Sequence, residues 1–126
     1  MTVVYLDRVV LLNLAVDYLL LMTYEWGYAA GPPMAVAPLP QVRQVLDYAV
    51  TAVPREKLLL GIPNYGYNWP IPYRQGVTRA VSLSNQEAIS LAVENGAVIQ
   101  YDEKVQSPCC LLYTSPSPRD RSVSRM

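Results

Sequence analysis

Two short apolar stretches of the chain each end in a cluster of aromatic and polar residues. The first covers 19–24 and continues into Glu25 and Trp26, and the second covers 58–63 and continues into the aromatic block 64–69. Continuous apolar runs of this length are typical of parallel strands buried on both faces. Because functional groups collect at the carboxyl ends of parallel strands, the pattern predicts two adjacent strands that present Tyr and Trp side chains at one edge.

The segment between these strands predicts a helix. Apolar residues recur at helical spacing over 40–53, and Pro54 ends the pattern. The Gly- and Pro-rich stretch 31–38 before the helix is expected to be a loop, and so is 70–76 after the second strand. Strand, helix and strand in this order predict a βαβ unit with a right-handed crossover.

A second helix and a hairpin are predicted after this unit. Ser84 is followed by Glu87 three residues later, which is the pattern of a capping box, so a helix is expected from Ser84 to about Glu94. Alternation over 97–101 predicts a strand, with 104–106 as its antiparallel partner. The expected fold class is therefore α/β.

Composition limits the chemistry that the chain can perform. Its 126 residues and 14.1 kDa suffice for one small domain or for a piece of a larger one. Ten basic and ten acidic residues give no electrostatic reason to expect a nucleic-acid partner. The chain has no histidine, and its two cysteines, Cys109 and Cys110, are adjacent, so neither a zinc-ligand spacing nor a disulfide framework is present. We expect no metal and no cofactor.

The first residues form an apolar segment, 1–21, interrupted by Asn13 and Asp17. A membrane-spanning helix needs ~20 apolar residues and tolerates a central carboxylate poorly, so this run is short for a span. Its order of residues resembles the opening of the membrane-embedded sporulation peptidase that processes the sigma-E precursor. None of that family's protease residues is present, so no peptidase activity is expected. A generic apolar helix or strand explains the segment equally well.

A second resemblance covers 15–108. The blocks that carry it are 22–28 (Met-Thr-Tyr-Glu-Trp-Gly-Tyr), 31–39, 61–69 (Gly-Ile-Pro-Asn-Tyr-Gly-Tyr-Asn-Trp), 84–88, 99–103 and 106–108. In order and spacing they resemble glycoside hydrolase family 18, and within it the spore-germination branch of cortex-lytic N-acetylglucosaminidases. The resemblance implies a fragment of a (β/α)8 TIM barrel containing strand six, helix six and strand seven, followed by the start of a small α+β insertion. Segment 1–14 is then a separate apolar segment whose origin is open.

The resemblance also implies a mechanism. In this family the 2-acetamido oxygen of the sugar attacks the anomeric carbon, while a glutamic acid in an Asp-x-x-Asp-x-Asp-x-Glu motif protonates the leaving oxygen. That motif does not occur in this sequence, so we expect no catalytic residue and no activity of the chain as written. Tyr24 matches the tyrosine that holds the acetamido group, and Glu25 matches a neighbouring substrate contact. The predicted substrate-binding residues are Tyr24, Glu25, Trp26, Tyr65, Tyr67 and Trp69, and for the aromatic residues after Glu25 packing is an equal alternative to sugar stacking.

These observations predict a fragment of a glycosidase that acts on an N-acetylglucosamine-containing polysaccharide, either spore-cortex peptidoglycan or a chitin-like polymer. A spore-associated or extracellular location follows from the resemblance, and no specific protein partner is expected. Two alternatives remain open. One is an N-terminal fragment of the membrane-bound sigma-factor-processing aspartic peptidase, which alone would make the membrane a partner, and the other is a non-catalytic carbohydrate-binding piece.

The end of the chain has a different character. Segment 110–120 resembles, residue for residue, one reading frame of a transposon-type sequencing adapter, so we expect 109–126 to be an artefactual and disordered tail. A natural Ser-, Pro- and Arg-rich tail is the alternative. A few parallel strands taken from a barrel should also expose sheet edges and an apolar face, which predicts a marginal and sticky fold.

Overall fold

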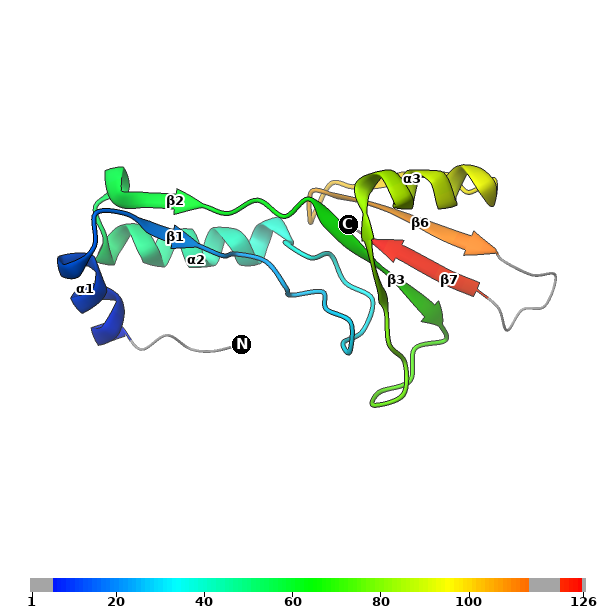
Figure 1. The fold of residues 1–126 in the computed structure, drawn as a ribbon, viewed down its shortest axis with the longest axis horizontal. Helices are drawn as coiled ribbons and strands as arrows, with labels where there is room; N and C mark the ends of the chain where they lie inside the picture. The colour runs from blue at the N-terminus through cyan, green and yellow to red at the C-terminus, as the bar shows by residue number, and fades with distance from the viewer. Residues whose placement is uncertain (1–5, 114–120, 126) are drawn as a thin grey trace.

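The computed structural model describes residues 6–113 and 121–125. The chain is elongated, and it has two parts that follow one another along the long axis (Figure 1). The first part contains a short parallel sheet and two helices. The second part contains an antiparallel sheet covered by one helix. In chain order the elements of the first part are α1 (Leu6–Ala15), β1 (Leu19–Leu21), α2 (Leu39–Ala52), a 3-10 turn (Arg55–Lys57) and β2 (Leu58–Leu60).

The predicted pairing of the two apolar strands is confirmed. β1 and β2 run parallel, with Leu19 opposite Leu58 and Leu21 opposite Leu60. The Gly61 N–H extends the ladder by donating to the Leu21 carbonyl at 2.9 Å. Helix α2 connects the two strands in sequence and lies along them (Figure 1), and its bounds agree with the predicted 40–53 within a residue at each end.

The strands are less buried than predicted. Leu20 remains 56% exposed and Leu59 49% exposed, so the expectation of strands buried on both faces is wrong for this chain. The reason is that the sheet has two strands and the described residues place no further strand beside it. The mixed α/β class is confirmed, while the described residues form no closed barrel. The exposed apolar face agrees with the expectation for strands taken from a barrel.

The second part is a five-stranded sheet in the order β4-β3-β7-β6-β5. Helix α3 (Asn85–Glu94) lies along it (Figure 1) and buries Ala88 and Ala92. The predicted capping box is confirmed, since the Ser84 hydroxyl accepts from the Glu87 N–H at 3.2 Å and the Glu87 carboxylate accepts from the Ser84 N–H at 2.8 Å. The strands are β3 (Tyr65–Ile71), β4 (Val81–Ser84), β5 (Gln100–Asp102), β6 (Ser107–Tyr113) and β7 (Arg121–Arg125).

Two local predictions need correction. Strand β3 extends to Ile71, into the stretch 70–76 that the prolines had indicated as loop. The hairpin partner of β5 begins at Ser107 rather than at 104–106, because the Gln106 N–H donates to the Asp102 carbonyl at 2.7 Å and closes a turn there.

Parts of the tail that was predicted to be disordered lie in strands of the structure. Residues 109–113 belong to β6 and residues 121–125 form β7, which pairs with both β3 and β6. Segment 114–120 and residue 126 lie outside the described residues. The adapter resemblance of 110–120 concerns the origin of this segment and stays a prediction.

Within the N-terminal apolar segment, Leu6–Ala15 form α1, a helix of 10 residues. Its end is held by the Lys57 ammonium, which donates to the carbonyls of Asn13 and Val16 at 3.1 Å each. Along 6–113 and 121–125 no helix has the length and apolar character to cross a membrane. Residues 1–5, which contribute to the peptidase resemblance, lie outside the described part.

Candidate functional site

The carboxylate of Glu25 connects the two parts of the molecule. Glu25 follows β1 by four residues and has a left-handed backbone with a φ of 71°. Its carboxylate accepts hydrogen bonds from the Tyr65 hydroxyl and from the Tyr67 hydroxyl, the latter at 3.0 and 3.2 Å to the two oxygens. Tyr65 and Tyr67 are two positions apart on β3, so both project from the same face of the strand.

Tyr24 lies at the point where β1 and β2 end together. A Cβ atom built on Gly61 would lie 3.1 Å from Cε1 of Tyr24, so the ring packs directly over the backbone of the neighbouring strand. Tyr24 is also close enough to Tyr65 to contribute to the raised pKa of that hydroxyl. The structure therefore brings together Tyr24, Glu25, Tyr65 and Tyr67 from the two stretches that the sequence had singled out.

The two β3 hydroxyls are held in their neutral form. Burial raises the pKa of Tyr65 well above its ordinary value, and the hydrogen bond to the Glu25 carboxylate and the charge of that carboxylate raise it further. The same causes, in the same order, raise the pKa of Tyr67. Near neutral pH both groups therefore serve as hydrogen-bond donors, and both are too weakly acidic to protonate a departing alcohol.

The aromatic row continues along β3 to Trp69. The rings of Tyr65 and Tyr67 meet edge to face with centroids 5.8 Å apart, and those of Tyr67 and Trp69 are 5.6 Å apart. Trp69 has 0% exposure, and its indole N–H donates to the Gly31 carbonyl at 2.9 Å. These contacts favour the packing interpretation of Trp69 over sugar stacking.

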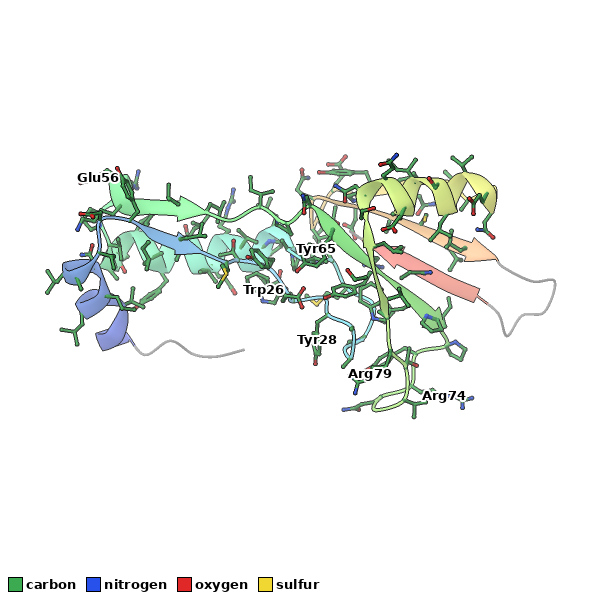
Figure 2. The ribbon with its side chains drawn as sticks, in the orientation of Figure 1. Trp26, Tyr28, Glu56, Tyr65, Arg74 and Arg79 are labelled. Carbon is green, nitrogen blue, oxygen red and sulfur yellow. The ribbon has the colours of Figure 1, made fainter. Side chains whose placement is uncertain are left out.

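Trp26 is half-buried and lies near the middle of the long axis, as Tyr65 does (Figure 2). Its backbone N–H donates to the Val36 carbonyl at 3.1 Å, and the next N–H, that of Gly27, donates to the Ala35 carbonyl at 2.9 Å. A Cβ atom on Gly27 would lie 2.0 Å from the Met34 carbonyl oxygen. The loop after β1 therefore folds back on itself at a place where only glycine fits.

Glycines are the residues of this region that the sequence prediction missed. Gly61 supports the Tyr24 ring, Gly27 allows the close return of the loop, and Gly31 accepts the hydrogen bond of the Trp69 indole. The available signal was their position inside the aromatic blocks, where a missing side chain leaves room for a ring or a backbone. Among the described residues no group of three or more His, Cys, Asp or Glu side chains could hold a metal ion.

Several known proteins are similar to this chain in sequence. The chain is 50% identical over 108 residues to the cortical fragment-lytic enzyme of Bacillus subtilis (strain 168), an alignment that covers 86% of this chain and 25% of the relative. It is 40% identical over 93 residues to the cortical fragment-lytic enzyme of Bacillus cereus, which covers 74% of this chain and 22% of the relative. No family model matches the chain.

Solved structures agree with these relatives. The crystal structure of the Bacillus cereus spore cortex-lytic enzyme SleL superposes with a TM-score of 0.84 at 32% identity, over 93% of this chain and 27% of that one. A chitinase from Chromobacterium violaceum superposes with a TM-score of 0.81 at 30% identity, over 94% of this chain and 35% of that one. The chain is related to the spore cortex-lytic enzymes and chitinases of glycoside hydrolase family 18.

The relationship to family 18 confirms the resemblance seen over 15–108. The chain spans about a quarter of the length of the curated relatives that it matches. The roles of the predicted substrate-binding residues stay predictions.

Proposed function

We propose that the chain is part of a glycosidase that hydrolyses an N-acetylglucosamine-containing polysaccharide, with spore-cortex peptidoglycan as the substrate, and that it acts at the spore. Support comes from the relatives, since three of them are cortical fragment-lytic enzymes by name. In this proposal β1 and β2 correspond to strands six and seven of a (β/α)8 barrel, and the antiparallel sheet belongs to the insertion that follows strand seven.

The proposed reaction is substrate-assisted hydrolysis with retention. The acetamido oxygen of the sugar forms a bond to the anomeric carbon, the glycosidic bond breaks, and the leaving oxygen takes a proton from an acid. Tyr24 holds the acetamido group through its hydroxyl, and Glu25 orients the sugar. Tyr65 and Tyr67 fix the Glu25 carboxylate by donating to it.

The chain as written supplies groups that bind the sugar but not the acid that protonates the leaving oxygen. The acid-bearing motif is absent from the sequence, and the raised pKa values of Tyr65 and Tyr67 make these hydroxyls unsuitable as replacements. Stabilising donors contribute substantially to rate, but they transfer no proton to the leaving group. We therefore propose that the chain binds the sugar and does not cleave it.

The observation that carries the proposal is the Glu25 carboxylate held between β1 and the tyrosines of β3, next to Tyr24. The test is calorimetric titration of the full chain with the tetramer of N-acetylglucosamine, with a parallel hydrolysis assay on the same oligomer. We expect binding without hydrolysis, and weaker binding by Tyr24→Phe and Glu25→Gln.

A matched control is Tyr101→Phe. The Tyr101 hydroxyl is exposed and donates to Gln106 at 3.0 Å in the second part of the molecule, so this variant removes a hydroxyl outside the proposed site. Equal affinities for Tyr24→Phe and Tyr101→Phe would contradict the assignment of Tyr24. Absence of binding by the unmodified chain would contradict the proposed function as a whole.

A further inference from the structure

The loop after Glu25 is bound to the hairpin that β3 and β4 form. The loop covers 26–36 and the hairpin 65–84, and the two lie side by side near the middle of the long axis (Figure 1). Three successive carbonyls of the loop accept hydrogen bonds from the hairpin, namely Ala29 O from Ala80 N–H at 2.8 Å, Ala30 O from the Tyr73 hydroxyl at 3.1 Å, and Gly31 O from the Trp69 indole N–H at 2.9 Å. The hairpin therefore holds the apex of the loop at three consecutive residues.

The base of the same loop lies next to the proposed sugar site. Trp26 N–H donates to the Val36 carbonyl at 3.1 Å, and Gly27 N–H donates to the Ala35 carbonyl at 2.9 Å. These two bonds join the arms of the loop directly after Glu25. The hairpin also reaches Glu25 itself, because the tyrosine hydroxyls of β3 donate to its carboxylate. One hairpin therefore contacts both the loop and the carboxylate that precedes it.

The turn of the hairpin is ordered by its own hydrogen bonds. Arg74 N–H donates to the Thr78 hydroxyl at 2.7 Å, and Thr78 N–H donates to the Arg74 carbonyl at 2.8 Å. These bonds close the turn between Tyr73 and Ala80, which are two of the three residues that donate to the loop. Tyr73 is half-buried and donates through its hydroxyl, so a change to Phe removes the bond and keeps the ring.

We propose that Tyr73 is a positioning residue of the sugar site. Its hydroxyl keeps the loop 26–36 in the conformation that binds the sugar, and it acts through the loop rather than by contact with the sugar. A loop that is ordered before binding loses less conformational entropy when the ligand arrives, which raises the affinity. This inference rests on the proposed function and adds that the antiparallel hairpin, as well as β1 and β2, determines the affinity of the site.

Amide hydrogen exchange of the full chain, measured by NMR, tests whether Tyr73 holds the loop. The N–H groups of Trp26, Gly27 and Gly31 report on the loop, because each donates to a carbonyl within it. In Tyr73→Phe these three groups should exchange about fivefold faster, the effect expected from the loss of one ordinary hydrogen bond. Val53 N–H, which donates to the Ala49 carbonyl at the end of α2, should exchange at an unchanged rate.

Calorimetric titration with the N-acetylglucosamine tetramer tests whether this order serves the site. We expect Tyr73→Phe to bind about threefold more weakly than the unmodified chain. Thr78→Val removes the acceptor of the Arg74 N–H and keeps the size of the side chain, so it should change loop exchange and affinity in the same direction. Tyr101→Phe is the matched control, because it removes an exposed hydroxyl of the same sheet that donates to Gln106, and it should leave both measurements unchanged.

The outcomes separate this inference from the proposed function. If the unmodified chain binds the tetramer and Tyr73→Phe matches Tyr101→Phe in affinity, the positioning role is overturned and the proposed function stands, whatever the exchange rates show. Equal acceleration at Val53 and at the loop would mean general destabilisation and would also overturn the positioning role alone. Absence of binding by the unmodified chain would overturn both.

Discussion

The Tyr67 hydroxyl donates to the Glu25 carboxylate at 3.0 Å, across 42 residues of sequence. This contact joins the loop after β1 to β3, and the Tyr65 hydroxyl shares the same acceptor. Glu25 has a left-handed backbone, so the direction of its side chain does not follow the alternation of side chains along a strand. The packing around Glu25 sets the direction of its carboxylate instead. The proposed binding site therefore depends on how the two parts of the molecule meet.

The tyrosine contacts predict a loss of stability at alkaline pH. The raised pKa values of Tyr65 and Tyr67 mean that the folded chain keeps these protons where the unfolded chain, with tyrosine pKa values of about 10, releases them. The free energy of unfolding should therefore fall as the pH rises through and above about 10, the pKa of tyrosine in the unfolded chain. Urea unfolding at pH 8 to 11 should show this loss, and it should be smaller in Glu25→Gln. Parallel curves for the two proteins would contradict the assignment.

The two tryptophans should report differently on sugar binding. Trp69 is fully buried and hydrogen-bonded to Gly31, whereas Trp26 is half-buried near the proposed site. We expect the N-acetylglucosamine tetramer to change the fluorescence of Trp69→Phe but not that of Trp26→Phe. Trp69→Phe should also lower the free energy of unfolding by ~2 kcal/mol, since it leaves a carbonyl unpaired and a small cavity. A sugar-dependent signal confined to Trp69 would contradict the packing interpretation.

Gly27→Ala and Gly61→Ala should differ sharply. On Gly27 a Cβ atom would meet the Met34 carbonyl oxygen at 2.0 Å, a backbone atom that cannot move freely, so we expect a loss of ~3 kcal/mol in urea unfolding. On Gly61 a Cβ atom would meet the Tyr24 ring at 3.1 Å, which can shift, and the Leu21 carbonyl oxygen at 3.2 Å, a much milder backbone approach than the 2.0 Å at Gly27. Gly61→Ala should therefore keep most of the stability and weaken sugar binding. The reverse order of stabilities would be inconsistent with the loop geometry.

The exposed leucines of the parallel sheet predict self-association. Leu20 and Leu59 lie on neighbouring strands at paired positions, and both are about half exposed. Open strand edges and apolar patches promote aggregation. The double variant Leu20→Thr with Leu59→Thr should raise the monomer fraction measured by analytical ultracentrifugation, and Val50→Thr on α2 serves as a control for general polarity. An unchanged monomer fraction would show that this face is not the cause.

Elements with strong local signals were predictable from the sequence. The Ser84 and Glu87 capping box fixed the start of α3, and Pro54 indicated the end of α2. The parallel pairing of β1 and β2 followed from two similar apolar runs separated by a helix. These features depend on neighbouring residues, so a single sequence reveals them.

Features that depend on distant partners were not predictable. Pro70 indicated a loop, yet it lies in β3. It pairs with β7 beyond the end of the β4 ladder at Asn68, where the part of the chain that the structure describes places no strand on the other edge of β3. The strand β7 comes from a segment expected to be disordered. The bonds from Tyr65 and Tyr67 to Glu25 also required the packing of two separate parts. The aromatic and acidic residue types pointed to the site, but their arrangement came from tertiary structure.

The most direct test places this chain in a complete enzyme. Residues 15–108 would replace the matching segment of the Bacillus subtilis cortical fragment-lytic enzyme, to which this chain is 50% identical over 108 residues, and hydrolysis of cortical fragments would be measured. We expect the chimera to be active, and its Tyr24→Phe variant to lose ~10²-fold in kcat, the typical effect of removing one stabilising donor. Tyr101→Phe should retain full activity. A folded chimera whose Tyr24→Phe variant is as active as its Tyr101→Phe variant would contradict the account.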